Sequence, residues 1–301
     1  MKIRVLGVPL DLGQERRGVD MGPLALRAAG LNRALRELGH EVEDAGNVVV
    51  HLLEELPPGD RRAKYLDEIA EASREVAERV RDTLAAGHFP LCLGGDHSMA
   101  IGTLAGVSAH FRGRGESVGL IWLDAHGDMN TPETTPSGNV HGMTFAASLG
   151  LGPEVLTEIL GYSPKLDPRR CVLIGVRDLD RLERENVRAS GIHVFTMREI
   201  DEWGMSAVIE HSLALAGEGT AGIAVTFDMD VVDPSEAPGV GTPIPGGITY
   251  REAHLAMEML AESGQMVSCE LVEINPILDT MNRTGKLGVE LICSALGKRI
   301  L

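Results

Sequence analysis

The chain has 301 residues, and its 44 acidic and 28 basic side chains give a formal net charge of −16. This length is enough for a sizeable core, and the 36 Gly and 15 Pro are too few for a disordered chain. The acidic balance argues against a nucleic-acid-binding protein, whose footprint must be basic.

Short apolar runs alternate with stretches of helical periodicity along the whole chain. The predicted strands are residues 3–9, 89–93, 118–123, 171–175, 191–195, 222–227 and 266–273. The predicted helices are residues 22–38, 61–86, 98–111, 179–189, 205–216, 249–263 and 284–296. The strands are rich in Val, Ile and Leu without alternation, which is typical of a parallel sheet covered on both faces. The sequence therefore predicts a single α/β domain over residues 1–301 with right-handed crossovers.

Neither export nor a membrane location is predicted. No stretch approaches the roughly 18 consecutive apolar residues of a transmembrane helix, and the first residues contain no export signal with a cleavage site. The four cysteines, Cys92, Cys171, Cys269 and Cys293, are widely spaced. We therefore expect a cytoplasmic protein whose cysteines are small buried apolar residues, and neither disulfides nor zinc ligands.

Polar residues follow the predicted strand 118–123, at the edge where a parallel sheet places its ligand site. They are Asp124, His126 and Asp128, and alternation along an extended chain would direct all three to one side. A charge directly after an apolar strand is costly unless it has a partner. Metal ligation is therefore favoured over a solvated loop.

Two further polar clusters follow predicted strands. Asp228 and Asp230 share one face at the end of strand 222–227, and His97 follows the Gly94-Gly95 turn after strand 89–93. Nearby, Asp233 precedes a proline and is predicted to cap a turn. Asp96 has three possible roles, as a ligand, as a helix cap, or as a group that orients a ligand, and the last is favoured.

The predicted metal ligands are two imidazoles and four carboxylates: His97, Asp124, His126, Asp128, Asp228 and Asp230. Six ligands are too many for one ion and suit two divalent ions bridged by carboxylates. The positive charges of the two ions balance the four carboxylates. Ligation rich in oxygen and free of thiolate favours Mn²⁺ over Zn²⁺ and leaves Fe²⁺ and Co²⁺ open. Two such ions about 3.5–4 Å apart can hold a bridging water and lower its pKa towards neutrality.

Three motifs resemble the signatures of the ureohydrolases, a family that includes arginase, agmatinase and formimidoylglutamase. They are G-G-D-H at 94–97, D-A-H-G-D at 124–128 and F-D-M-D-V-V-D-P at 227–234. The segment 18–27, G-V-D-M-G-P-L-A-L-R, is similar to the family's N-terminal segment, so the resemblance spans the chain. It implies a three-layer α-β-α fold with a mostly parallel central sheet, as in arginases and deacetylases. It also implies two Mn²⁺ per subunit and cleavage of a guanidino or similar C–N bond.

The segment 130–142, N-T-P-E-T-T-P-S-G-N-V-H-G, is dense in amide and hydroxyl groups at the same sheet edge. Composition alone fits a solvated loop as well as a carboxylate-binding one. The segment resembles the arginase version, which binds the α-carboxylate of the amino acid. By this resemblance the carboxylate is held by Asn130, Thr135 and Ser137, with Asn139 close by.

Three acidic residues and one threonine are further candidates for substrate binding. Asp180 and Glu183 begin a predicted helix, where acidic residues are favoured in any case. By resemblance to arginase they hold the α-ammonium, Asp180 more directly. Glu273 ends the last predicted strand and needs a partner, either a substrate guanidinium or an arginine of the protein itself. Its E-I-N-P context resembles the E-V-N-P of arginase and favours the substrate. Thr242, in a Pro- and Gly-rich loop, is either a lesser contact or turn scaffold.

The resemblance implies hydrolysis of L-arginine to L-ornithine and urea by a metal-bridging hydroxide. Asp128 would help to move its proton, His141 would shuttle protons to solvent, and Glu273 would hold the guanidinium. The alternative is another ureohydrolase, such as an agmatinase or a guanidinobutyrase, whose substrate lacks the α-carboxylate or the α-ammonium. A metal-binding protein without turnover would not need His141 and Glu273, and a zinc deacetylase would not need six ligands. The expected partners are a small-molecule substrate and further copies of the chain, as a trimer or hexamer, with neither nucleic acid nor membrane.

Overall fold

Eight strands form one sheet in the order β2-β1-β5-β10-β9-β6-β7-β8, and every neighbouring pair runs parallel. The computed structural model describes residues 1–299, so residues 300 and 301 of the predicted domain lie outside the described residues. The strands are β1 (Lys2–Val8), β2 (Glu41–Asn47), β5 (Phe89–Gly94), β6 (Gly119–Leu123), β7 (Cys171–Val176), β8 (His193–Thr196), β9 (Ile223–Asp228) and β10 (Met266–Val272). A separate antiparallel pair consists of β3 (Gly59–Asp60) and β4 (Ala63–Lys64).

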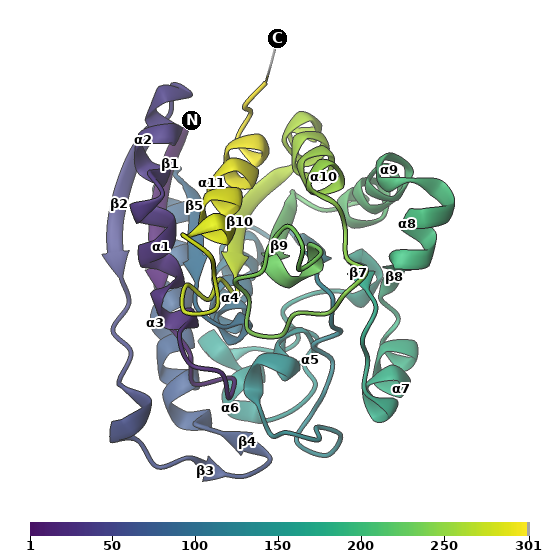
Figure 1. Ribbon diagram of the computed structural model, residues 1–301. Helices are drawn as coiled ribbons and strands as arrows, with labels where there is room; N and C mark the ends of the chain where they lie inside the picture. The colour runs from purple at the N-terminus through teal and green to yellow at the C-terminus, as the bar shows by residue number, and fades with distance from the viewer. Residues whose placement is uncertain (300–301) are drawn as a thin grey trace.

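Helices cover both faces of the sheet and make three layers (Figure 1). One face is covered by α1 (Gly22–Ala28), α2 (Leu31–Glu37), α8 (Met197–Trp203), α9 (Met205–Gly217), α10 (Tyr250–Ser263) and α11 (Arg283–Ala295). The other is covered by α3 (Leu66–Ala85), α4 (Ala100–Arg112), α5 (Thr144–Ser148), α6 (Glu154–Thr157) and α7 (Arg181–Ser190). The predicted three-layer α/β fold is therefore confirmed.

The strands are apolar on both sides because each face of the sheet contributes to a separate core. In β6, Ile121 and Leu123 pack in the core beneath α8–α11, whereas Leu120 and Trp122 pack in the core beneath α3–α5. All four side chains are fully buried. Burial on both faces explains why the sequence shows continuous apolar runs instead of alternation.

Two predicted helices differ from the structure. The predicted helix 22–38 is two helices, α1 and α2. Gly30, which lies between them, has a φ of 93° and interrupts the helical backbone. The predicted helix 61–86 begins only at Leu66, because the residues before it form the β3–β4 pair and Tyr65 has a φ of 52°. In both places a left-handed residue interrupts a stretch whose apolar spacing looks continuous.

One strand of the main sheet and several short helices are not among the predicted elements. The missed strand is β2, whose sequence Glu-Val-Glu-Asp-Ala-Gly-Asn is polar because it lies at the edge of the sheet. Helix α8 begins with a capping box between Thr196 and Glu199, a signal that the sequence did contain. The four cysteines are free and buried, as predicted. Within residues 1–299, no helix is long and apolar enough to cross a membrane.

Candidate metal centre

Four adjacent strands deliver polar residues to one edge of the sheet. In the order β5, β10, β9 and β6, their carboxyl ends lead to His97, Glu273, Asp228 and Asp124. Because all the strands are parallel, these ends lie together although they are far apart in the sequence. All four residues are buried, with at most 3% exposed.

His97 lies at the centre of the first group of possible metal ligands. Its Nδ1 atom is 3.1 Å from Asp124 Oδ2, 3.2 Å from Asp128 Oδ2 and 3.1 Å from Asp228 Oδ2. His97, Asp124 and Asp228 each offer one ligand atom, and these atoms lie close enough together to hold a metal ion. The imidazole thus faces three carboxylates from two different strands.

His126 lies at the centre of the second group. Its Nδ1 atom is 3.0 Å from Asp230 Oδ2 and 3.4 Å from Asp124 Oδ1. Asp124, His126 and Asp230 form the second set of residues that could hold a metal ion. Asp124 belongs to both sets and directs one oxygen to each imidazole, as expected of a carboxylate that bridges two ions.

The charges at this edge fit two cations. Burial opposes ionisation of Asp124, yet hydrogen bonds to His126 and His97 hold the pKa of its carboxyl well below the usual range. Burial and the nearby Asp124 raise the pKa of Asp128 to about 6, and burial with Asp230 and Asp124 raises the pKa of Asp228 well above its usual value. Crowded buried carboxylates ionise together only when positive charge is added, and two divalent ions would supply it. The donor set of carboxylate oxygens with two imidazoles suits ions such as Mn²⁺.

The predicted metal ligands meet for a different reason from the one we expected. Alternation along a strand was wrong as the explanation, because β6 ends at Leu123 and the following residues leave the sheet. Asp128 has a φ of 52°, and Glu273, directly after β10, has a φ of 65°. A left-handed conformation is costly for residues other than glycine and is concentrated at functional sites. Asp228 is the last residue of β9, and the other five predicted ligands lie in the segments after β5, β6 and β9. The strand ends and these segments together therefore bring the side chains to one place.

Two buried side chains of the sheet support the possible ligands from below. The indole Nε1 of Trp122 donates a hydrogen bond of 2.9 Å to Asp124 Oδ2, and its ring stacks on His97 with 4.2 Å between centroids. Thr226 Oγ1 lies 2.9 Å from His97 Nε2. Sequence analysis did not assign a role to either residue, because only the register of the strands brings them under the site.

Asp96 and Asp233 lie outside both sets of possible ligands. Asp96 accepts hydrogen bonds from the backbone N–H of Gly13 (2.7 Å) and of Ser98 (2.9 Å), so it caps the turn that carries His97. This was one of its three proposed roles, though not the favoured one. Asp233 accepts hydrogen bonds from Ser235, Gly246 and Gly247, and its predicted turn-capping role is confirmed.

Glu273 has three hydrogen-bond partners and forms no ion pair with an arginine in residues 1–299. Its Oε1 atom accepts from the backbone N–H of His97 (2.9 Å) and lies 3.2 Å from His141 Nδ1, while its Oε2 atom accepts from Gln14 Nε2 (2.8 Å). Burial opposes the charged imidazolium of His141, but the hydrogen bond and charge of Glu273 raise its pKa to about 9. Gln14, which follows β1 at the same edge, was missed because no motif marks it.

The loop 130–142 lies beside the start of α7. Asn130 Nδ2 donates to Asp180 Oδ2 over 3.3 Å, which joins the two regions predicted to hold the α-carboxylate and the α-ammonium. Within the loop, Thr135 Oγ1 lies 3.5 Å from Ser137 Oγ. Asn139 Oδ1 accepts from Lys64 Nζ over 3.2 Å, and Ser137 is exposed.

Glu183 and Thr242 both contact the rest of the site. The buried carboxylate of Glu183 accepts from the backbone N–H of Met129 (3.1 Å) and of Asp180 (3.1 Å), and burial raises its pKa to about 7. This capping box stabilises the start of α7, so contact of Glu183 with a substrate ammonium stays a prediction. Thr242 Oγ1 donates to Asp230 Oδ2 over 2.9 Å.

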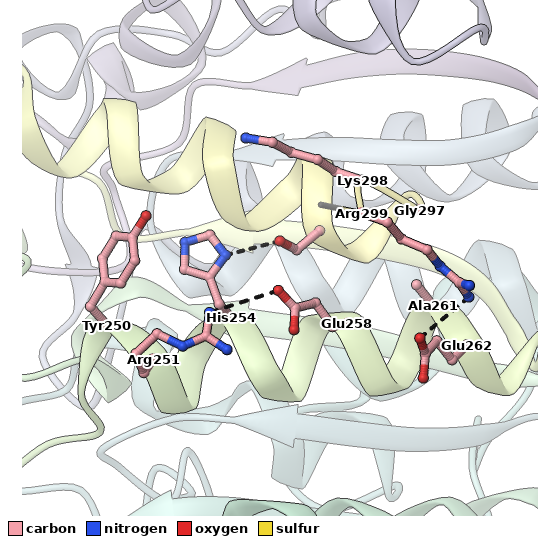
Figure 2. A pocket seen from close by; sticks show the side chains of 10 residues that line it. Tyr250, Arg251, His254, Glu258, Ala261, Glu262, Gly297, Lys298 and Arg299 are labelled. Atoms are coloured by element: carbon pink, nitrogen blue, oxygen red, sulfur yellow. Dashed lines mark hydrogen bonds and ion pairs between the residues drawn. The ribbon is translucent and has the colours of Figure 1, made fainter. Parts of the chain in front are cut away.

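A surface groove of about 520 Å³ lies elsewhere, between α10 and the C-terminal end of α11 (Figure 2). His254 Nδ1 lies 2.9 Å from Ser294 Oγ, and Arg299 pairs with Glu262 at 3.3 Å. None of the six predicted metal ligands lines this groove. The polar edge of the sheet is therefore the candidate site.

Comparison with known proteins identifies close relatives. A profile of the Arginase family matches residues 1–297. The sequence is 52% identical over 300 residues to the arginase of Bacillus caldovelox and 50% identical over 299 residues to that of Bacillus subtilis (strain 168). Each alignment covers 99% of both chains. The native structure of the Bacillus caldovelox arginase superposes with a TM-score of 0.96 at 52% identity and covers 100% of this chain and 99% of that one.

Proposed function

The chain belongs to the arginase family, and we propose that it hydrolyses L-arginine to L-ornithine and urea at a centre of two Mn²⁺ ions. The observation that carries this proposal is the pair of His–Asp groups that share Asp124. The full-length similarity to two named arginases supports the substrate. We propose His97, Asp124, His126, Asp128, Asp228 and Asp230 as the metal ligands.

The substrate would bind between the metal ligands and the loop 130–142. Asn130, Thr135, Ser137 and Asn139 offer amide and hydroxyl donors to the α-carboxylate. Asp180 and Glu183 offer acceptors to the α-ammonium, of which Asp180 is the more accessible, since it is exposed whereas Glu183 is buried. Because Asn130 bonds Asp180, both ends of the amino acid would meet a single connected surface.

Glu273 would bind the guanidinium end. It is held between His141 and Gln14 with its carboxylate directed to the metal edge, and among the described residues no arginine pairs with it. A planar guanidinium matches a carboxylate with two parallel hydrogen bonds. Thr242, which bonds Asp230, would be a lesser contact at this end.

Two divalent ions held by this site would polarise a water molecule and lower its pKa towards neutrality. Asp128 would accept the proton that the attacking water releases and pass it to the ornithine nitrogen as the bond from that nitrogen to the guanidinium carbon breaks. The carbon, with its two remaining nitrogens and the new oxygen, leaves as urea once the second proton of the water has also passed to the ornithine nitrogen, which leaves as an ammonium. His141, which is partly exposed and paired with Glu273, would exchange protons between the site and solvent.

The decisive experiment measures urea release from L-arginine and from agmatine, with metal-free protein and after addition of Mn²⁺. We expect release from L-arginine that depends on the metal, and little release from agmatine, which gives the loop 130–142 no carboxylate to bind. Faster release from agmatine would instead support the agmatinase alternative. Other divalent metals, added in parallel, test the preference for Mn²⁺.

We also propose that residues 1–301 act as a single ureohydrolase domain, in the cytoplasm, as a trimer or hexamer of identical chains. Sedimentation velocity of the purified protein tests the oligomeric state. A sedimenting species of one chain would contradict that part of the proposal and leave the chemistry untouched.

A further inference from the structure

Glu270, in the middle of β10, is a buried carboxylic acid that the proposed chemistry does not use. It is 1% exposed, and neither of its carboxylate oxygens has a hydrogen-bond partner among residues 1–299. Burying a carboxyl group without a hydrogen-bond partner is costly, and an apolar residue at this position in the sheet would avoid that cost. Its position therefore calls for a functional reason.

The register of the sheet places Glu270 in a row of side chains beneath the candidate metal centre. Glu270 pairs with Cys92 of β5 on one side and with Thr226 of β9 on the other, and Thr226 pairs with Trp122 of β6. Residues paired across parallel strands direct their side chains to the same face. Two members of the row, Thr226 and Trp122, contact His97 directly.

The hydrogen bond between Thr226 and His97 has a defined direction when His97 binds a metal. The Nδ1 atom of His97 faces Asp124, Asp128 and Asp228, so the metal would bind at this atom. The proton of the neutral imidazole must then be on Nε2. Nε2 then donates to Thr226 Oγ1, 2.9 Å away, and the hydroxyl proton of Thr226 needs an acceptor. The neighbouring acceptor is Glu270, which pairs with Thr226 across β10 and β9.

We propose that Glu270 positions His97 for metal binding through the hydroxyl of Thr226. In this Glu270–Thr226–His97 relay, the buried carboxylate orients the hydroxyl, and the hydroxyl fixes the tautomer and the ring orientation of the ligand. A carboxylate that acts behind a ligating histidine also makes the imidazole a stronger donor to the metal. The inference rests on the proposed metal centre and adds Glu270 and Thr226 to it as positioning residues.

The test measures Mn²⁺ binding by isothermal titration calorimetry on metal-free protein and by elemental analysis after dialysis. Thr226→Val removes the hydroxyl while keeping the shape, and Glu270→Gln replaces the carboxyl group by an amide of the same size. We expect each variant to lower the affinity for one of the two Mn²⁺ ions about 10- to 100-fold and to leave the other ion bound as in wild type. Thr226→Ser, which keeps the hydroxyl, should restore binding to within a few-fold of wild type.

Two further variants separate the relay from a general effect on the core. Ser268→Ala removes another buried hydroxyl from the same face of β10, two residues from Glu270, and should leave both ions bound as in wild type. The double variant Thr226→Val/Glu270→Gln should bind the more weakly held ion no less tightly than Thr226→Val alone. Glu270 acts through Thr226, so its loss has no further effect once the hydroxyl is gone.

The outcomes distinguish this inference from the proposed function. Wild-type protein that fails to bind two Mn²⁺ ions would overturn the metal centre itself. If wild-type protein binds two ions and Thr226→Val binds both equally tightly, the relay is refuted and the metal centre is not. If Glu270→Gln does not fold, the comparison of Thr226→Val with Thr226→Ser decides.

Discussion

The indole of Trp122 donates a hydrogen bond of 2.9 Å to Asp124, the carboxylate shared by the two groups of possible metal ligands. The same ring stacks on His97 with an interplanar angle of 19° and on Phe145 with an angle of 12°. Trp122 is fully buried, so these contacts are protected from water. A core side chain therefore fixes the orientation of two residues that we propose as ligands.

Replacing Trp122 by Phe should weaken metal binding without removing the stack on His97. The variant loses the donor to Asp124, so we expect Mn²⁺ affinity to fall about 10-fold. The unsatisfied acceptor and the smaller ring should also lower the free energy of unfolding by about 1–3 kcal/mol. Calorimetric titration and denaturant unfolding measure both effects. Trp203→Phe, at a half-exposed position, is the matched control, and equal Mn²⁺ affinity in Trp122→Phe and the control would contradict the prediction.

Replacing His97 by Asn should remove one of two metal ions and lower the rate of urea release steeply. The imidazole Nδ1 lies within 3.2 Å of three carboxylates, and an amide oxygen at the same place is a weaker donor to the metal than an imidazole nitrogen. We expect a loss of at least about 100-fold in affinity for that ion, since removing a ligand costs more than removing its support. Elemental analysis of the dialysed protein is the measurement, with His193→Asn at the surface as control. Unchanged turnover with two bound ions would refute the assignment of His97 as a ligand.

Much of the fold and site could be predicted because the signals are local. The central strands are continuous apolar runs, and polar clusters directly follow three of them. Parallel strands bring their carboxyl ends to one edge, so His97, Asp124 and Asp228 could be placed together without knowing the strand order. β2 escaped prediction because an edge strand needs only backbone pairing, and its side chains are mostly polar.

The remaining features depend on register and on loop conformation, which the sequence does not state. Glu270 and Thr226 lie side by side only because β10 and β9 pair in one particular register. The direction of the Asp128 side chain depends on a left-handed backbone conformation, which Asp adopts more readily than most residues but which the sequence does not specify at this position. The role of Gln14 depends on its reach across the sheet edge to Glu273.

Replacing His141 by Asn should lower kcat and leave both metal ions bound. The imidazole contacts Glu273 and is not part of either group of possible ligands, so metal content should be that of wild type. The loss of a group that carries protons between site and solvent should cost about 100- to 10,000-fold in kcat and change the pH–rate profile. Steady-state urea release between pH 6 and 10 is the measurement. The shuttle role fails if the shape of the profile is the same in both proteins.

The ion pair of His141 with Glu273 should make the stability of the metal-free protein depend on pH. The pKa of His141 is raised from 6.5 to about 9 in the folded state. A raised pKa stabilises the fold fully below about pH 6.5, and the stabilisation disappears as the pH rises through about 9. The shift corresponds to at most about 3 kcal/mol. Guanidinium unfolding at several pH values should show this loss in wild type and a flatter dependence in His141→Asn. If the free energy of unfolding of wild type rises between pH 6.5 and 9 relative to that of the variant, the prediction is wrong.

Replacing Ser137 by Ala should raise KM for L-arginine with little change in kcat. Ser137 is exposed and lies in the loop proposed to bind the α-carboxylate, 3.5 Å from Thr135. A hydrogen bond to a charged group contributes about 1.5–3 kcal/mol, which corresponds to a KM about 10- to 100-fold higher. This bond is far from the reacting carbon and is equally strong in the ground state and the transition state, so kcat should be retained. Ser206→Ala, on the surface of α9, is the control. A KM equal to that of the control would remove Ser137 from the binding surface and shift the carboxylate to the amide groups of Asn130 and Asn139.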